Sequence, residues 1–191
     1  MLRGSPDTFS WQKRGETISH KAELILERVF QLMHEEESNG RTGVVLKVSV
    51  TDKPHSGPDY YMSVPLLDRP CIGRLSDHFR LSRYATYASE KDFRLKVRHA
   101  KDGHVSSRQS RNKAELQYQG AVAFAGINDP EFGESLTIVV SVSGLPEVCD
   151  EAFALILGLE MGWTTLPLAL KIAETTENTF FQLVVVPQLF S

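Results

Sequence analysis

Residues 135–144 read SLTIVVSVSG, and a second extended stretch, QGAVAFAG, occupies 119–126. In the first of these, every second residue from Leu136 to Val142 is a large aliphatic, and the residues between them are mostly smaller or polar. This period of two is typical of a strand with one face in a core. The intervening residues 127–134 are rich in Asn, Asp, Pro and Gly, so the two stretches are predicted to form a hairpin.

The same pattern occurs earlier in the chain. The stretch GVVLKVSV at 43–50 alternates in the same way, and the turn formers of 52–59 separate it from a second β-like stretch that starts at Tyr60. These segments predict a first antiparallel hairpin. At the other end of the chain, the apolar residues of 179–186 predict a final strand.

Three segments have helical patterns. Apolar residues recur at helical spacing from Ile18 to Leu32, with Thr17 as the expected cap and the pair 39–40 (Asn-Gly) as the expected stop. Residues 74–102 contain neither Gly nor Pro, so one or two helices are expected there, capped by Ser76 or Asp77 and ended at 101–103. A third helix is expected with Pro146 in its first turn and Gly162 at its end.

The order of these elements predicts an α+β fold in which two hairpins build an antiparallel sheet flanked by helices. With 191 residues, of which 41% are hydrophobic and 24% charged, the chain has the composition of one globular domain. We expect a flexible lead-in at 1–16 and a single domain at 17–191. No uncharged apolar stretch is long enough to span a membrane, and the two cysteines do not suggest a disulfide framework. These features predict a cytoplasmic protein with no membrane partner.

Charge is segregated along the chain. Residues 74–113 carry 11 basic and 4 acidic residues, a local net charge of +7, whereas the rest carries 10 basic and 20 acidic residues, a net charge of −10. The basic window contains two tyrosines available for stacking on nucleic acid, but the chain has a net charge of −3 and no nucleic-acid-binding motif. We expect instead that the window pairs with acidic residues such as Asp150 and Glu151 at the surface or between subunits. This predicts a homo-oligomer and no nucleic-acid partner.

Three motifs resemble one known family. The stretch 119–124 (QGAVAF) precedes 138–155 (IVVSVSGLPEVCDEAFAL), in which VSGLP is followed by the acidic pair Asp150-Glu151. Upstream, 83–88 (RYATYA) is similar to a Lys-Ala-x-Thr-Ala helix motif. Over residues 17–162 the chain resembles the GlcG/HbpS-like family of small profilin-like proteins, and 163–191 is a C-terminal extension without a counterpart.

The resemblance implies a profilin-like α+β domain that binds a small molecule or assembles into oligomers. Family members are associated with haem or cobalamin-related binding, so haem or another tetrapyrrole is the cofactor that the resemblance suggests. At the family's motif positions this chain has Arg83 in place of a lysine and Gly120-Ala121 in place of a paired glycine. Together with Ser143 and Gly144, Arg83 and Gly120 form the candidate ligand-binding set.

The residues of the turn 143–146 also suggest a hypothesis that does not depend on the family resemblance. Backbone N–H groups at a helix N-terminus can hold a carboxylate or phosphate. Glu147, Asp150 and Glu151 would repel such an anion, which favours a purely structural turn. Cys149 in the same segment is predicted to be buried and inert, and Cys71 belongs to no motif.

His78, His99 and His104 lie in or beside the basic window and are the candidate axial ligands if haem binds. None has the spacing of a metal site, and the chain lacks the phosphate-loop, dinucleotide, zinc-protease and serine-hydrolase motifs. No residue is therefore assigned a catalytic role. The sequence predicts a non-enzymatic binding or assembly protein, and the alternative is an enzyme whose active site forms at a subunit interface near Arg83, Gly120 and Ser143.

Overall fold

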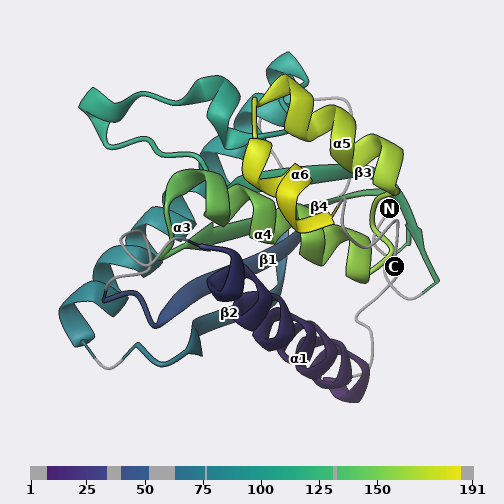
Figure 1. Cartoon of the computed structure of the whole chain (residues 1–191). Helices are drawn as coiled ribbons and strands as arrows, with labels where there is room; N and C mark the ends of the chain where they lie inside the picture. Colours follow the sequence, from purple (N-terminus) through teal and green to yellow (C-terminus); the bar gives the residue numbers. More distant parts are fainter. Residues whose placement is uncertain (1–7, 34–39, 52–62, 76, 131–132, 186–191) are drawn as a thin grey trace.

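A computed structural model describes residues 8–33, 40–51, 63–75, 77–130 and 133–185. Figure 1 shows their arrangement. The elements in chain order are α1 (Thr8–Leu32), β1 (Gly43–Thr51), β2 (Ser63–Gly73), α3 (His78–Asp102), two 3-10 turns (Ser107–Ser110 and Lys113–Glu115), β3 (Ala121–Asp129), β4 (Gly133–Ser143), α4 (Glu147–Glu160), α5 (Leu166–Thr175) and α6 (Thr179–Val185). None of the helices described is both long and apolar enough to cross a membrane.

The four strands form one antiparallel sheet in the order β2-β1-β4-β3. The β1–β2 and β3–β4 pairs are the two predicted hairpins. They join through β1 and β4, where Val48 lies opposite Val140. The predicted α+β fold, with an antiparallel sheet flanked by helices, is confirmed.

One face of the sheet carries the main apolar core. The alternate aliphatic residues of β1 and β4, such as Leu46 and Ile138, are buried there against α1 and α4. The helices α5 and α6 pack against α4, and this layer lies in front of the sheet in Figure 1. The period-two pattern therefore identified the correct face of both central strands.

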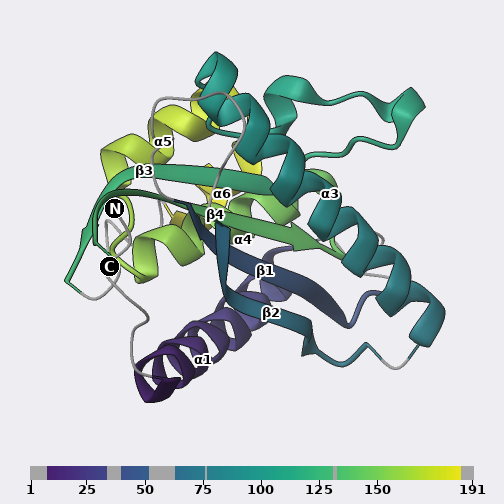
Figure 2. The same ribbon diagram turned by 180° about the vertical axis from the view of Figure 1, so that it is seen from behind.

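Among the described α-helices, α3 is the one that covers the opposite face, as the reverse view in Figure 2 shows. Its apolar cluster is small, and consists of Leu95, Ala121, Ala123 and Val139. Buried hydrogen bonds supply the other contacts. Ser49 Oγ donates to Asp92 Oδ1 at 2.6 Å, and Ser141 Oγ donates to the carbonyl of Ala88 at 2.7 Å. Polar groups thus make a large part of this helix–sheet contact.

α3 is a single helix with clear signals at both ends. The side chain of Asp77 accepts hydrogen bonds from the N–H groups of Phe79 and Arg80, so Asp77 is the N-cap. At the other end Gly103 adopts a left-handed conformation, with φ +71°, and closes the last turn. The predicted break at 101–103 is confirmed.

The predicted C-terminal strand is wrong, because residues Thr179–Val185 form helix α6. Asn178 Oδ1 accepts a hydrogen bond from the N–H of Phe181 and so starts the helix. Phe181, Val184 and Val185 then bury one helical face against the core. A β-rich composition is overridden here by tertiary packing.

The start of α1 also differs from the prediction. The helix begins at Thr8 rather than Thr17, so Thr8–Glu16 of the expected flexible lead-in is helical. Arg14 forms an ion pair with Asp129 of β3, which anchors this part of the helix to the sheet. That contact spans 115 residues of sequence and has no local signal.

Three predicted boundaries need smaller corrections. α1 ends at Leu32 rather than at 39–40, although Gly40 does have the left-handed φ of +70° expected of a stop, and Asn39 lies outside the described residues. Pro146 is the N-cap of α4 rather than its first helical residue. The described part of β2 begins at Ser63, and Tyr60 lies outside the described residues.

The contact between α4 and the sheet yields a prediction. A methyl group added at Gly158 would lie 2.3–2.8 Å from three ring atoms of Phe124. Gly158→Ala should lower the free energy of unfolding by about 1–3 kcal/mol through overpacking, even though alanine favours helix. Urea denaturation measures the change. Phe124→Leu in the Gly158→Ala background should recover part of the loss, and strictly additive losses in the two single variants would contradict the contact.

Candidate functional site

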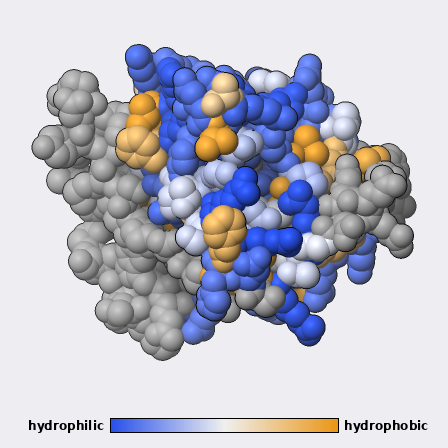
Figure 3. All heavy atoms as spheres, turned by 90° about the vertical axis from the view of Figure 1, so that its left-hand side faces the viewer, coloured by the Kyte–Doolittle hydropathy of each residue, from blue (hydrophilic) through white to orange (hydrophobic). Residues whose placement is uncertain are grey.

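A cavity of about 520 Å³ lies between α3 and the first turn of α4, and we call it the α3–α4 cavity. Its wall includes the segment before β1, the α3 face, the residue Tyr118 before β3, and the turn that leads into α4. The charged and aromatic residues of the lining are Arg41, Arg83, Tyr84, Tyr87, Lys91, Tyr118, Glu147 and Asp150. Figure 3 views the molecule from the side on which these elements meet, where hydrophilic residues dominate the surface and hydrophobic ones are scattered.

Arg83 and two tyrosines form the outer wall of the cavity. Arg83 Nε donates to the hydroxyl of Tyr87 at 2.9 Å, and its guanidinium carbon lies 5.4 Å from the centre of the Tyr87 ring. The rings of Tyr87 and Tyr118 meet edge to face at 5.0 Å. The hydrogen bond to Tyr87 raises the pKa of Arg83. No carboxylate among the described residues pairs with Arg83, so an exposed cation is held in place by aromatic contacts.

The inner end of the cavity is a buried ion pair. Lys91 Nζ lies 3.1 Å from Asp150 Oδ2 and also donates to the carbonyl of Val142 at 2.7 Å. The other oxygen of Asp150 accepts a hydrogen bond from the N–H of Leu145 at 2.9 Å. Lys91 is only 2% exposed, so both charges are out of water and each has further hydrogen-bond partners.

Gly120 lies directly behind this pair. A Cβ added there would meet Asp150 Cβ at 2.7 Å and Lys91 Nζ at 2.8 Å, and the residue has φ +121°. Both the space and the backbone conformation therefore require glycine. The absence of a side chain at Gly120 leaves the space that the Lys91–Asp150 pair occupies.

The first turn of α4 is less repulsive to anions than its acidic residues predict. Glu147 pairs with Arg111 at 2.7 Å and lies 3.7 Å from Lys113. Asp150 is neutralised by Lys91, and Arg41 donates to the carbonyl of Gly144 at 2.7 Å. Both acids of the lining are therefore paired with cations, and Arg83 is left without a carboxylate partner among the described residues.

Asp150 does pair with the basic window, as predicted, but the pair with Lys91 is buried inside one chain and does not lie at the surface. The predicted pairing of Glu151 is wrong. Glu151 is fully buried and pairs with no cation among the described residues: it accepts hydrogen bonds from the Ser106 hydroxyl, from Thr176 Oγ1 at 2.9 Å and from Asn178 Nδ2 at 2.8 Å. Burial raises the pKa of Glu151. This carboxyl fastens the loop after α3 and the α5–α6 connection to α4.

Burial raises the pKa of Asp150 from 3.8 to about 6, against the opposing effects of Lys91 and of the hydrogen bond from Leu145. A carboxyl whose pKa is higher in the folded chain than in the unfolded chain costs stability when it ionises. The contribution of Asp150 is therefore fully present below pH 3.8 and is lost as the pH rises through about 6. In the same range the cavity acquires a negative charge at its inner end.

The structure brings most of the predicted ligand-binding set together. Arg83, Ser143 and Gly144 line the cavity, and Gly120 lies behind it. Lys91 was not among the predicted site residues, although it follows Arg83 and Tyr87 at intervals of four on one helical face. That spacing could have identified Lys91 as a neighbour of Arg83 and Tyr87. No sequence pattern could have identified Tyr118 and Arg41, because only the tertiary structure places them beside α3.

The structure separates one candidate haem ligand, His78, from the other two. His78 is exposed at the start of α3, whereas His99 lies in its last turn, where its Nδ1–H donates to the carbonyl of His104 at 2.7 Å. The 25 residues of α3 separate its ends by roughly 36 Å. None of the three histidines lines the α3–α4 cavity. Among the described residues, no group of His, Cys, Asp and Glu could hold a metal ion.

The two cysteines lie apart from the cavity lining. Cys149 is buried in the core below the first turn of α4, as expected from its position. Cys71 is half-buried near the end of β2, where its sulfur lies 3.4 Å from the backbone nitrogen of Leu75.

Comparison with family models, with curated proteins and with solved structures gives no match for this chain.

The buried pair predicts a specific titration. In the wild-type protein the Asp150 carboxyl should titrate near pH 6, and in Lys91→Met the pKa should rise further because the ammonium that lowers it is gone. Carboxyl-detected NMR across pH 3–9 measures both values. Lys101→Met, which removes an exposed lysine from the same helix, should leave the Asp150 titration unchanged. A lower pKa of Asp150 in Lys91→Met would exclude the pairing.

Proposed function

We propose that the protein is a non-enzymatic binding protein that holds a small molecule with a planar ring and a carboxylate or similar anionic group in the α3–α4 cavity. The observation that carries this proposal is the position of Arg83, an exposed guanidinium with no described carboxylate partner, fixed against Tyr87 at a tyrosine-lined cavity. The volume of about 520 Å³ suits a ligand of drug or cofactor size.

The charges support an anionic ligand. Lys91, Arg41 and Arg83 outnumber Asp150 in the lining, and Glu147 is offset by Arg111 and Lys113. A guanidinium can donate two parallel hydrogen bonds to a carboxylate, which adds geometric specificity to the charge attraction. The Nε of Arg83 already donates to Tyr87, so its terminal nitrogens are the ones available to a ligand.

The aromatic residues support a planar ligand. Tyr84, Tyr87 and Tyr118 are half-buried side chains from two separate segments, and all three line the same cavity. Aromatic rings gain from offset or edge-to-face contact with another ring. A flat molecule could therefore lie against these rings while its anionic group reaches Arg83.

Haem ligation by His78, His99 or His104 gains no support from this cavity, because none of the three lines it. A tetrapyrrole remains within the proposed class only as a planar acid whose carboxylates contact Arg83 or Arg41. The proposal therefore rests on recognition of an anion by cationic side chains and does not need a metal–histidine bond.

The homo-oligomer was expected because basic and acidic residues are segregated along the chain, and contacts within one chain explain that segregation. The basic window pairs with acidic residues of the same chain, through Lys91 with Asp150, Arg111 with Glu147, and Arg108 with Glu177 at 2.7 Å. The segregated charges thus meet within the fold. Self-association is not needed to explain them.

A second candidate function is proton transfer by Asp150, because a carboxyl with a pKa near the working pH beside a cavity is a feature of acid–base catalysts. Both oxygens of Asp150 are already bonded, one to Leu145 and one to Lys91. This arrangement favours a structural carboxyl, so we place binding before catalysis.

Ligand-observed NMR with 2-naphthoate and its uncharged analogue 2-naphthamide tests the proposal. We expect the carboxylate to bind at least tenfold more tightly than the amide, because a charge-assisted hydrogen bond contributes about 1.5–3 kcal/mol. Arg83→Met should remove most of that difference. Arg98→Met removes an exposed arginine about 22 Å further along α3 and should have no effect. Equal binding of acid and amide to the wild-type protein would refute an anion site.

A further inference from the structure

Lys91 is the one buried lysine among the described residues, with 2% of its surface exposed. It lines the inner end of the α3–α4 cavity, where its Nζ lies 3.1 Å from Asp150 Oδ2. Replacing a buried ion pair by apolar residues is often neutral or even stabilising, so stability is a weak reason to bury a lysine. Its position in the wall of a cavity brings the amine within reach of a ligand.

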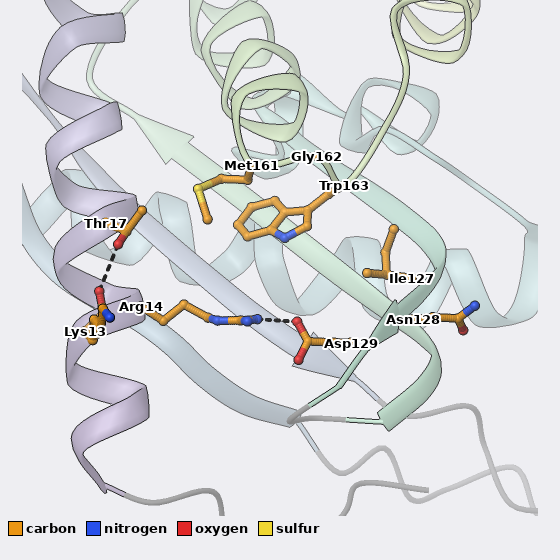
Figure 4. Close-up of a pocket in the computed structure, with 9 residues that line it drawn as sticks. All are labelled: Lys13, Arg14, Thr17, Ile127, Asn128, Asp129, Met161, Gly162 and Trp163. Atoms are coloured by element: carbon orange, nitrogen blue, oxygen red, sulfur yellow. Dashed lines mark hydrogen bonds and ion pairs between the residues drawn. The ribbon is translucent and has the colours of Figure 1, made fainter.

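Two further cavities are also lined by a lysine, and in both the lysine is exposed. One, of about 430 Å³, is bounded by α1, the end of β3 and Trp163, and Figure 4 shows Lys13 at its edge. The other, of about 290 Å³, is lined by β3 and α5 and includes Lys171. Lys13 and Lys171 therefore combine a cavity with a solvated amine, and they serve as internal comparisons for Lys91.

Three side chains of α3 line the α3–α4 cavity in order along one face of the helix. Arg83, Tyr87 and Lys91 are four residues apart, so each lies roughly 6 Å further along the helix axis than the one before. The Nε of Arg83 donates to the Tyr87 hydroxyl at 2.9 Å, which fixes the first two relative to one another. The helix thus presents a guanidinium, an aromatic ring and a buried amine over about 12 Å.

This order favours a ligand whose reactive groups lie at opposite ends. With a carboxylate at Arg83 and a planar ring against Tyr87, the far end of the ligand lies at Lys91. Lysine amines that are buried react with carbonyl carbons to form imines. A 2-oxo acid fits the spacing poorly, because its carbonyl carbon is bonded directly to its carboxylate. An aromatic aldehyde with the carboxylate across the ring matches it.

Asp150 is placed to take the proton that the reaction must remove. An amine attacks a carbonyl carbon only in its neutral form, and Lys91 Nζ already donates a hydrogen bond to Asp150 Oδ2. Burial raises the pKa of Asp150 to about 6, so its carboxylate is a stronger base than that of an ordinary aspartate. The N–H of Leu145 holds the other carboxyl oxygen, which keeps Oδ2 directed at the amine.

We propose that Lys91 captures an aromatic aldehyde, with a carboxylate at the opposite end of its ring, as a covalent imine in the α3–α4 cavity. This inference rests on the function proposed above and names its ligand class. Nζ forms a bond to the aldehyde carbon, gives one proton to Asp150 and gives two to the carbonyl oxygen, which leaves as water. An ion pair becomes a neutral imine beside a neutral carboxyl, so the step creates no buried net charge.

Reductive trapping tests the step in the wild-type protein. Sodium cyanoborohydride converts an imine to a stable secondary amine, and peptide mapping by mass spectrometry then locates the adduct. With 4-formylbenzoate as the probe, Lys91 should be labelled at least tenfold faster than the exposed Lys13 and Lys171. Benzaldehyde, which lacks the carboxylate, should label Lys91 at least tenfold more slowly, because a charge-assisted hydrogen bond contributes about 1.5–3 kcal/mol.

Variants separate recognition from the covalent bond. Arg83→Met should slow the labelling of Lys91 about tenfold, whereas the matched control Arg98→Met, further along α3, should leave the rate unchanged. Lys91→Met should abolish the major adduct. It should still bind 4-(hydroxymethyl)benzoate, which has the same ring and carboxylate but no carbonyl, in ligand-observed NMR. If Lys91→Met fails to fold, the maps of the wild-type protein and of Arg83→Met decide the question.

Two outcomes would overturn the covalent step. One is labelling spread evenly over Lys91, Lys13 and Lys171. The other is binding of 4-(hydroxymethyl)benzoate to the wild-type protein with no aldehyde adduct on Lys91, which would leave the proposed binding function intact. Failure of 4-(hydroxymethyl)benzoate to bind would instead refute the binding function and this inference with it.

Discussion

The ion pair between Lys91 and Asp150 links α3 to α4, two helices that lie on opposite faces of the sheet and are far apart in the sequence. Lys91 comes from the helix on one face of the sheet, and Asp150 from the helix on the other. They meet at the end of β4, where Lys91 also binds the carbonyl of Val142 and Asp150 binds the N–H of Leu145. Burying two charges is costly, and these extra hydrogen bonds are what make it tolerable.

The same pair explains the architecture around it. Gly120 is required because any side chain at that position would occupy the space of the pair. The pair also closes the inner end of the α3–α4 cavity, so one contact both holds the layers together and shapes the candidate site.

Different kinds of contact stabilise the two faces of the sheet. The face covered by α1 and α4 is held by burial of large aliphatic and aromatic residues. The face covered by α3 relies on small side chains and on buried polar contacts, among them Arg94, which donates to the carbonyls of Ser107 and Tyr118. Part of the positive charge of the basic window is thus neutralised or hydrogen-bonded inside the fold.

The elements whose pattern is local could be predicted from the amino-acid sequence: both hairpins, the buried face of β1 and β4, and the helical segment that starts at Ser76 or Asp77 and ends at 101–103. The candidate set that contains Arg83, Gly120, Ser143 and Gly144 came from motifs that resemble a known family, and such motifs are also local in sequence. The tertiary structure was needed to show that Thr179–Val185 is a helix, that Lys91 faces Asp150, and that Tyr118 and Trp163 line cavities. Those outcomes depend on which buried surfaces and charges meet across long stretches of chain, and no local pattern carries that information.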